Sequence, residues 1–161
     1  MEVRVQNADD MSRFAANFIA QLSPDQRGAT VLGLSGELGA GKTTFAQATA
    51  RALGVEETVN SPTFVIEKIY SLQNQRWQRL IHIDAYRLKS ADELRALGWD
   101  DIVADKNNLI VIEWPENVPS LIPETARRIS IKINEDEART ITYSGLPDRT
   151  AEAVRSGGRN P

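Results

Sequence analysis

The chain has 161 residues, of which 41% are hydrophobic and 25% are charged. This is the composition of an ordinary globular domain, and it excludes a disordered or fibrous protein. The length favours one compact domain with a real hydrophobic core. We expect this domain to span residues 1–146. Residues 147–161 lack apolar periodicity, and we expect them to form a mobile C-terminal tail.

The net charge indicates how the protein would meet RNA, and the cysteine content and N-terminal residues indicate its cellular compartment. Nineteen basic and 22 acidic residues give a net charge of -3, so a contact with RNA is expected to run through a partner protein. Because the chain has no cysteine, disulfides and thiolate metal sites are excluded. No apolar run approaches the roughly 18 residues of a membrane span. Residues 1–4 contain an acid where a signal peptide carries a basic segment, so we expect a cytoplasmic protein with no membrane contact.

The first half of the chain predicts two strands and two helices. Residues 3–5 alternate like a short edge strand, and residues 29–34 form the nearly continuous apolar run of a strand covered on both faces. The first helix has candidate N-caps at Asn7, Asp9 and Asp10 and a predicted buried stripe of Met11, Phe14, Ala15, Phe18, Ile19 and Leu22. The second helix should end at Gly54, and its predicted buried residues are Phe45, Ala48, Thr49, Ala52 and Leu53.

The second half predicts five strands and one short helix. Residues 63–70 and 80–84 flank a short polar stretch, which is typical of an antiparallel hairpin. Residues 90–93 match a capping box and predict a helix that ends near Gly98. Residues 109–112 predict another strand buried on both faces. Two alternating segments around an acidic turn predict a C-terminal hairpin, with inward-facing residues Ile129, Ile131, Ile133, Ile141 and Tyr143.

The most specific motif lies between the first buried strand and the second helix. Gly36-Glu37-Leu38-Gly39-Ala40-Gly41-Lys42-Thr43 fits the phosphate-loop pattern G-x-x-x-x-G-K-S/T without a mismatch. Its glycines let backbone N–H groups turn towards a polyphosphate, and the N-terminus of the following helix attracts the same anion. Lys42 can reach the β- and γ-phosphates, and the Thr43 hydroxyl can bind Mg²⁺. The predicted nucleotide-binding residues are Glu37, Leu38, Gly39, Ala40, Gly41, Lys42, Thr43 and Thr44.

This motif, placed between a buried strand and a helix, decides the fold class. We predict an α/β protein with a three-layer P-loop NTPase fold. Its mainly parallel sheet is expected to be extended by the antiparallel hairpins.

A phosphate loop that works with Mg²⁺ needs an acid at the end of a neighbouring strand. Glu113 follows one apolar strand and Asp84 ends another, so both are candidates. Either acid can also be an ordinary solvated residue at a strand end. We expect Thr43 and Glu113 to approach the ion and Asp84 to orient the attacking water, although the roles of the two acids can be exchanged.

Several neighbouring residues allow both a structural and a functional interpretation. His82 shares a strand face with Asp84, and a lone strand histidine is more often a structural residue. Arg87 can offset charge on a transferring phosphoryl group or form a surface ion pair. Thr63 can contact the γ-phosphate or can be a turn residue before a strand. Trp114 can pack over the site or simply fill the core.

Four blocks of residues together resemble the bacterial TsaE (YjeE) family. They are Gly36 to Thr44, Ser61-Pro62-Thr63-Phe64, His82-Ile83-Asp84-Ala85-Tyr86-Arg87-Leu88 and Glu113-Trp114-Pro115-Glu116. They occur in the family's order over roughly residues 29 to 117. The phosphate loop alone is shared with countless NTPases, whereas the four blocks in one short chain are much more specific.

The resemblance implies a small ATPase that is needed for the N6-threonylcarbamoyl modification of adenosine 37 in tRNAs that read codons beginning with A. It implies the partner proteins TsaB and TsaD, and contact with tRNA through their complex. TsaD transfers the threonylcarbamoyl group, and the ATPase hydrolyses ATP on the complex and is weak alone. The implied cofactors are ATP or ADP and Mg²⁺.

The resemblance also assigns roles to particular residues. The Mg²⁺ positions of the family fall on Thr43 and Glu113, and its catalytic or water-positioning acid falls on Asp84. We count Lys42 with these two acids among the catalytic residues. Adenine contacts in the family come partly from the segment before the first helix, here around Asn7 to Asp10, and we expect Asp10 to be one of them.

Two other functions remain open at the level of sequence. A small P-loop kinase is one, although its usual arginine-bearing lid is not evident, and Arg127-Arg128 is the only adjacent arginine pair. The other is a nucleotide-dependent binding module that does not hydrolyse its nucleotide. The presence of Asp84 and Glu113 favours hydrolysis over this second alternative.

Overall fold

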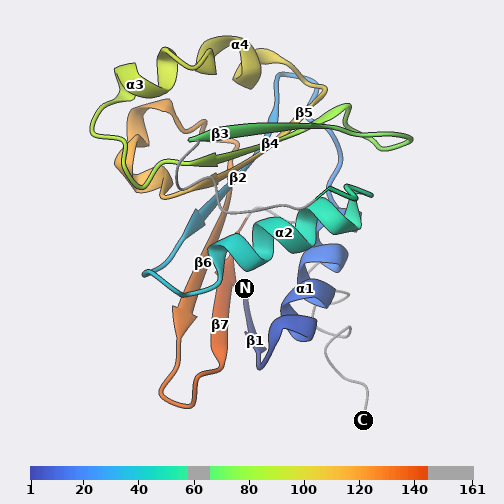
Figure 1. Ribbon diagram of the computed structural model, residues 1–161, viewed down its shortest axis with the longest axis vertical. Helices are drawn as coiled ribbons and strands as arrows, with labels where there is room; N and C mark the ends of the chain where they lie inside the picture. The colour runs from blue at the N-terminus through green and yellow to red at the C-terminus, as the bar shows by residue number, and fades with distance from the viewer. Residues whose placement is uncertain (58–65, 145–161) are drawn as a thin grey trace.

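The computed structural model describes residues 1–57 and 66–144 (Figure 1). The helices and strands follow one another as β1 (Glu2–Val5), α1 (Ala8–Ala20), β2 (Thr30–Ser35), α2 (Lys42–Ala52), β3 (Glu67–Ser71), β4 (Arg79–Asp84), α3 (Ala91–Arg95), α4 (Trp99–Ala104), β5 (Asn108–Glu113), β6 (Arg127–Ile133) and β7 (Arg139–Tyr143). Two short 3₁₀ helices, Pro115–Asn117 and Pro119–Leu121, lie between β5 and β6. No helix within the described residues is long and apolar enough to cross a membrane.

The strands form one sheet in the order β1-β7-β6-β2-β5-β4-β3. The four central strands, β6, β2, β5 and β4, run parallel to one another. The outer strands pair antiparallel, β3 with β4 on one side and β1, β7 and β6 on the other. The predicted fold class is therefore confirmed, with the parallel part of the sheet at its centre and the antiparallel hairpins at its edges.

Helices cover both faces of the central strands, as the apolar character of those strands requires. Helices α1 and α2 pack on one face, and α3 and α4 on the other (Figure 1). Successive residues of β2 point to opposite faces, so Leu32 and Leu34 join the core under α1 and α2, and Val31 joins the core under α4. This gives the predicted three layers.

Aromatic rings join α1, α2 and β7 on the first face. The Phe14 and Phe18 rings of α1 lie within 5.6–6.3 Å of Phe45 in α2 and Tyr143 in β7, measured between ring centroids. Tilted and edge-on aromatic pairs at these distances stabilise a core beyond their buried area. The cluster fixes the phosphate-loop helix against the C-terminal hairpin.

The ends of the first two helices follow from their local sequence. Asn7 caps α1, because its Oδ1 accepts a hydrogen bond from the Asp10 N–H at 2.9 Å. Helix α2 ends before Gly54, whose φ of +80° is the left-handed conformation of a helix stop. Both predictions are confirmed, but Ala52, which was expected to be buried, is exposed.

The region after β4 differs from the sequence-based prediction. Helix α3 ends at Arg95, and a second helix that was not predicted, α4, begins after Gly98. Ser90 takes the N-cap position, but its side chain makes no capping hydrogen bond. The Glu93 carboxylate instead accepts a hydrogen bond from the Lys89 N–H at 2.7 Å.

Helices α3 and α4 are short, and each is held by one buried side chain rather than by a periodic apolar stripe. The sequence pattern therefore does not separate them. Leu94 of α3 and Trp99 of α4 are the buried anchors, with exposed fractions of 0% and 1%. Within the described residues, the first strand of the β3–β4 hairpin runs over Glu67–Ser71, and its predicted start at residue 63 lies outside them. Residues 58–65 and the predicted tail, residues 147–161, lie outside the described residues.

The turn from β2 into the phosphate loop gives a prediction on stability. Gly36 has a φ of +152°, and a Cβ there would lie 2.5 Å from the Ile131 carbonyl oxygen of β6. We expect Gly36→Ala to lower the free energy of unfolding by roughly 2 kcal/mol or more. The strain of the positive φ and the clash of the new Cβ with the Ile131 carbonyl oxygen are both destabilising, and their energies add. Urea denaturation measures this change.

Gly39→Ala is the matched control, since Gly39 also has a positive φ but has open space where its Cβ would stand. Backbone strain alone predicts a loss of about 1 kcal/mol there. Equal losses at the two positions would contradict the close approach of β6 to the loop.

Candidate functional site

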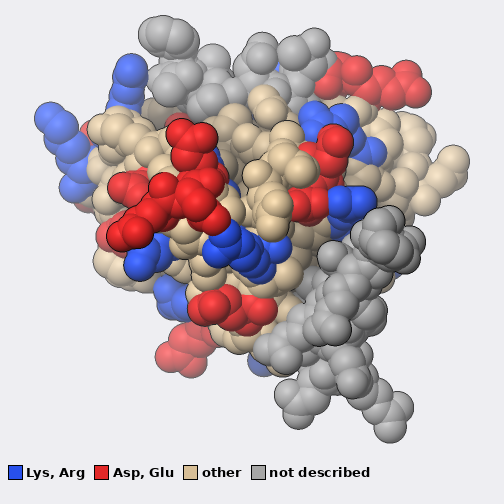
Figure 2. Space-filling view, turned by 90° about the horizontal axis from the view of Figure 1, so that it is seen from below, with Lys and Arg blue, Asp and Glu red and all other residues tan. Residues whose placement is uncertain are grey.

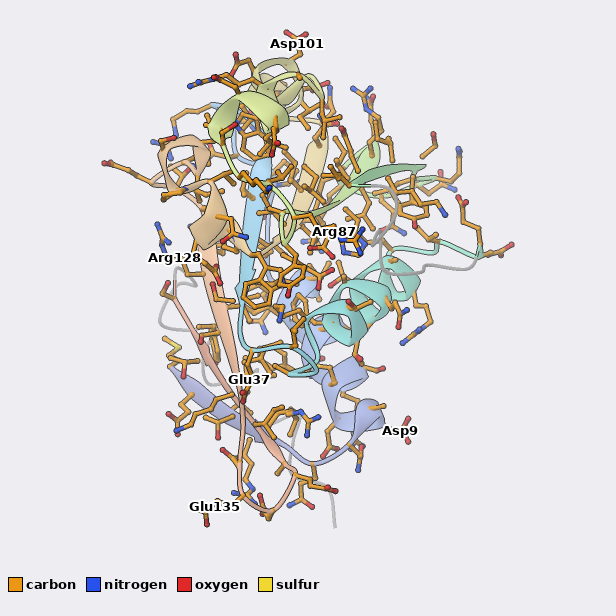
Figure 3. The ribbon with its side chains drawn as sticks, turned by 60° about the vertical axis from the view of Figure 1, so that its left-hand side comes forward. Asp9, Glu37, Arg87, Asp101, Arg128 and Glu135 are labelled. Atoms are coloured by element: carbon orange, nitrogen blue, oxygen red, sulfur yellow. The ribbon has the colours of Figure 1, made fainter. Side chains whose placement is uncertain are left out.

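The phosphate loop opens at the carboxyl ends of the parallel strands. It connects β2 to α2, and Leu34 near the end of β2 pairs with Glu113 at the end of β5. Glu113 pairs in turn with Asp84 at the end of β4. Figure 3 shows the loop, with Glu37 labelled, and the segment after β4, with Arg87 labelled. The sheet therefore brings both predicted acids to the edge from which the loop emerges.

These residues line a cavity of about 270 Å³. Its lining residues are Leu38, Gly39, Gly41, Lys42, Thr43, Thr44, Asp84, Tyr86, Arg87, Glu113 and Trp114. The structure thus gathers in one place the predicted lysine, the two predicted acids, both threonines of the loop and Arg87. Leu38 and Tyr86 stay largely exposed at its mouth.

Lys42 is held inside its own loop. Its Nζ donates hydrogen bonds to the carbonyl oxygens of Gly36, at 2.6 Å, and Glu37, at 2.9 Å. The ammonium also lies 4.3 Å from the centre of the Trp114 ring, a cation–π distance. Burial lowers the pKa of Lys42, and the negative charge of Glu113 opposes that change. An incoming phosphate would take the place of the carbonyl oxygens as the partner of this ammonium.

Glu113 is the centre of a buried hydrogen-bond chain. The Thr43 hydroxyl lies 3.1 Å from Glu113 Oε1 and 3.4 Å from Oε2, and His82 Nε2 lies 2.7 Å from Oε2. Glu113 is 3% exposed and His82 is 1% exposed. A carboxylate so deeply buried is stable only when hydrogen-bond donors face it, and the two neighbours supply them.

The oxygen atoms of Thr43 and Glu113 fit a magnesium ion. Mg²⁺ prefers hydroxyl, carboxylate, phosphate and water oxygens, and it is usually held by one or two protein groups together with the phosphates of a nucleotide. The described residues contain no group of three or more His, Asp and Glu that could form an all-protein metal site. The donor set therefore fits an ion that is shared with a bound nucleotide.

Asp84 lies beside this pair and is 9% exposed. Its Oδ1 accepts a hydrogen bond from the Tyr86 N–H at 2.9 Å, which fixes the carboxylate at the end of β4. Burial raises the pKa of Asp84 above its ordinary value, the Tyr86 hydrogen bond opposes that rise, and the charge of Glu113 adds to it. A carboxylate with a raised pKa is a better proton acceptor.

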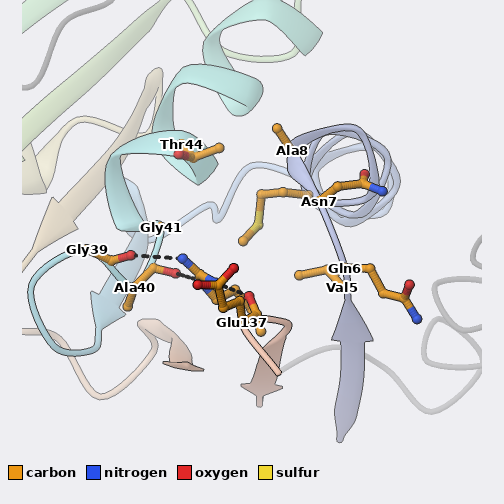
Figure 4. A pocket seen from close by; sticks show the side chains of 11 residues that line it. Val5, Gln6, Asn7, Ala8, Gly39, Ala40, Gly41, Thr44 and Glu137 are labelled. Carbon is orange, nitrogen blue, oxygen red and sulfur yellow. Dashed lines mark hydrogen bonds between the residues drawn. The ribbon is translucent and has the colours of Figure 1, made fainter. Parts of the chain in front are cut away.

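A second cavity, of about 210 Å³, lies on the other side of the loop (Figure 4). Its lining residues are Val5, Gln6, Asn7, Ala8, Met11, Gly39, Ala40, Gly41, Thr44, Glu137 and Arg139. The start of α1, the phosphate loop and the β6–β7 hairpin therefore meet there.

Asp10 does not line this second cavity, although it was expected to contact the nucleotide. Its carboxylate accepts a hydrogen bond from the Gln6 N–H at 2.9 Å and pairs with Arg13. These two interactions hold Asp10 at the start of α1, and Asn7 and Ala8 face the cavity instead.

Arg139 is a residue of the site that the sequence did not reveal. Its Nε donates to the Ala40 carbonyl oxygen at 3.0 Å, and its Nη2 donates to the Gly39 carbonyl oxygen at 3.2 Å (Figure 4). Strand β7 thus holds the phosphate loop through two backbone carbonyls. No local pattern signals this role, because Arg139 and its loop partners lie about 100 residues apart in the chain.

The remaining predicted residues divide into three cases. Trp114 has a φ of +60°, its ring lies 5.0 Å from the Tyr86 ring at a tilt of 48°, and both residues line the first cavity. Arg87 faces the first cavity. Ser61-Pro62-Thr63-Phe64 lies outside the described residues.

The raised pKa of Asp84 predicts that this acid destabilises the fold at neutral pH. The folded protein binds the Asp84 proton more tightly than the unfolded chain does, so stability is lost as the pH rises from the ordinary carboxyl pKa of 3.8 through the raised pKa of the folded state. We expect Asp84→Asn to raise the free energy of unfolding at pH 7 and to have no such effect below pH 3.8.

Urea denaturation across this pH range measures the change. Glu124→Gln removes a carboxylate from an exposed position and is the matched control. A gain in stability at pH 7 that is equal for the two variants would contradict the prediction.

The contacts of Arg139 predict a second effect on stability. Arg139→Ala removes two hydrogen bonds to the loop carbonyls and should lower the free energy of unfolding by about 1–3 kcal/mol. Arg139→Lys should recover only part of the loss, because one ammonium does not reproduce the fork of a guanidinium. Arg128→Ala, an exposed position on β6, is the control. Unfolding free energies of Arg139→Ala and Arg128→Ala that are the same would contradict the assignment.

Comparisons with known proteins show the family to which this chain is related. A family model described as "Threonylcarbamoyl adenosine biosynthesis protein TsaE" matches residues 5–141. The tRNA threonylcarbamoyladenosine biosynthesis protein TsaE of Streptomyces coelicolor is 39% identical over 132 residues, which are 79% of this chain and 87% of that protein. The protein of the same name from Bacillus subtilis is 39% identical over 119 residues, which are 74% of this chain and 72% of that protein.

A solved structure extends the comparison to three dimensions. The crystal structure of Bacillus subtilis YdiB is similar with a TM-score of 0.73 and 28% sequence identity, over 99% of this chain and 94% of that one. The family model spans the phosphate loop, both strand-end acids and Arg139. The resemblance drawn from four blocks of sequence is thus confirmed, and the chain belongs to the TsaE family.

Proposed function

We propose that this protein is a Mg²⁺-dependent ATPase of tRNA threonylcarbamoyladenosine biosynthesis. The observation that carries the proposal is the Thr43–Glu113 contact of 3.1 Å at the mouth of the phosphate loop. A hydroxyl and a carboxylate oxygen this close together suit an ion that is bound to a nucleotide, and this supports the proposal. The names of the relatives support the place in tRNA modification.

The chain's own groups account for hydrolysis by positioning and charge. Backbone N–H groups of residues 39–43 hold the phosphates, and the Lys42 ammonium offsets their charge. Mg²⁺ bound by Thr43 and Glu113 would supply further charge neutralisation. Asp84 orients the attacking water and accepts its proton, which the raised pKa of this carboxyl favours.

The second cavity is the place for the nucleobase in this proposal. It lies directly beside the phosphate loop and includes Asn7 and Ala8 from the segment before α1 and its first turn. Its apolar lining residues Val5 and Met11 suit the flat face of a base. ATP is the nucleotide that the family resemblance implies.

Contact with tRNA is proposed to run through the partner proteins TsaB and TsaD in the cytoplasm. The net charge is -3. On the face seen in Figure 2, the basic side chains of the described residues are separated by acidic and uncharged ones. In this proposal TsaD transfers the threonylcarbamoyl group to adenosine 37 of tRNAs that read codons beginning with A, and ATP hydrolysis takes place on the complex.

Steady-state ATP hydrolysis, measured for the purified protein alone and with TsaB and TsaD added, tests the whole proposal. Slow turnover that rises sharply with the two partners is the expected result. Demonstrated nucleotide binding with turnover that the partners leave unchanged would contradict the partner-activated ATPase and favour a P-loop kinase.

Substitutions in the site should separate binding from turnover. Lys42→Ala removes the charge-assisted hydrogen bonds that this ammonium would donate to the β- and γ-phosphates, worth about 1.5–3 kcal/mol each, so ATP affinity should fall by roughly 10²-fold or more. Glu113→Ala and Asp84→Ala should keep nucleotide and lose turnover by about 10²–10⁴-fold. Calorimetric titration and single-turnover hydrolysis measure the two effects.

Lys132→Ala, an exposed basic position on β6, is the control for the loss of a positive charge. ATP affinity that Lys42→Ala leaves unchanged would contradict the phosphate site. Wild-type turnover in both acid variants would remove the support for the magnesium site.

A further inference from the structure

His82 has an unusual environment for a buried side chain on a central strand. Its side chain is 2% exposed, and its Nε2 lies 2.7 Å from Glu113 Oε2. Its Nδ1 is buried and has no hydrogen-bond partner among the described residues. The ring therefore makes one polar contact, and that contact is with the proposed magnesium ligand.

The contacts of the two nitrogens indicate which of them carries the proton. The Glu113 carboxylate can only accept a hydrogen bond, so Nε2 carries the hydrogen that fills the 2.7 Å contact. The geometry therefore places on Nε2 the hydrogen that the contact with Glu113 needs.

This hydrogen bond makes the two oxygens of Glu113 unequal. Oε2 is tied to His82 at 2.7 Å, while Oε1 is the oxygen closer to the Thr43 hydroxyl, at 3.1 Å. Asp84 stands on the neighbouring strand in register with Glu113, and the charges of the two acids repel each other. Without the Nε2–H donor, the carboxylate would lose the contact that holds it towards Thr43.

We propose that His82 is a positioning residue, which holds Glu113 in the orientation that binds Mg²⁺ in the nucleotide complex. The inference rests on the proposed function, because it assigns a role towards the ion that Thr43 and Glu113 would hold. Groups that orient a metal ligand without touching the metal commonly change metal affinity by about 10–100-fold. His82 acts on the ion through Glu113 and contacts neither nucleotide nor water in this scheme.

Two isosteric substitutions isolate the Nε2 donor. The side-chain nitrogen of His82→Gln stands near the position of Nε2, whereas that of His82→Asn stands near the position of Nδ1, so only the glutamine restores a donor to Glu113. His82→Leu lacks any donor and adds no buried amide, and it replaces His82→Asn if that variant does not fold. Thr49→Val is the matched control, because Thr49 is also buried and its hydroxyl has no hydrogen-bond partner among the described residues.

The measurement is the affinity for a non-hydrolysable ATP analogue, by calorimetry, in EDTA and at increasing Mg²⁺ concentrations. We expect His82→Asn and His82→Leu to bind the analogue normally in EDTA but to need about 10-fold or more Mg²⁺ for the half-maximal effect. His82→Gln and Thr49→Val should respond to Mg²⁺ like the wild-type protein. A merely structural role would lower the affinity in EDTA as well.

Three results would overturn the inference. One is a Mg²⁺ dependence of His82→Leu that equals that of the wild-type protein. The second is an equal loss of affinity in EDTA and in Mg²⁺ for all three His82 variants. The third is a wild-type affinity that does not depend on Mg²⁺. Failure of the wild-type protein to bind the analogue at all would instead contradict the proposed function itself.

Discussion

The constraint on which the site depends is the burial of one negative charge. Glu113 ends the central strand β5 and is 3% exposed, so its carboxylate must be met by donors from its neighbours. His82 on β4 and Thr43 on α2 meet it from two sides. The parallel pairing of β5 with β2 and β4 sets the distances between these groups. The same pairing that builds the core thus assembles the candidate magnesium site.

The phosphate loop is shaped by contacts from outside its own motif. Behind it, β6 approaches so closely that only glycine fits at position 36. At its tip, Arg139 of β7 bonds to the carbonyl oxygens of Gly39 and Ala40. The antiparallel hairpin at the edge of the sheet therefore fixes the loop and borders the cavity proposed for the base.

Function and stability oppose each other at Asp84. Burial and the nearby Glu113 charge raise the pKa of this carboxyl, and the raised pKa means that the charged form destabilises the fold at neutral pH. The same environment makes Asp84 a better proton acceptor. Lys42 is also a buried charge, and its ammonium is satisfied by two carbonyl oxygens of its own loop.

The sequence alone determined the fold class, the position of the phosphate loop and the positions of Asp84 and Glu113 at strand ends. Each of these depends on local patterns. Apolar runs mark buried strands, and the glycine spacing with Lys42 and Thr43 marks the loop. The tertiary structure decided what depends on long-range contacts. It placed Arg139 on the loop and bonded His82 to Glu113. No short-range pattern encodes such contacts, since the pairing of distant strands sets them.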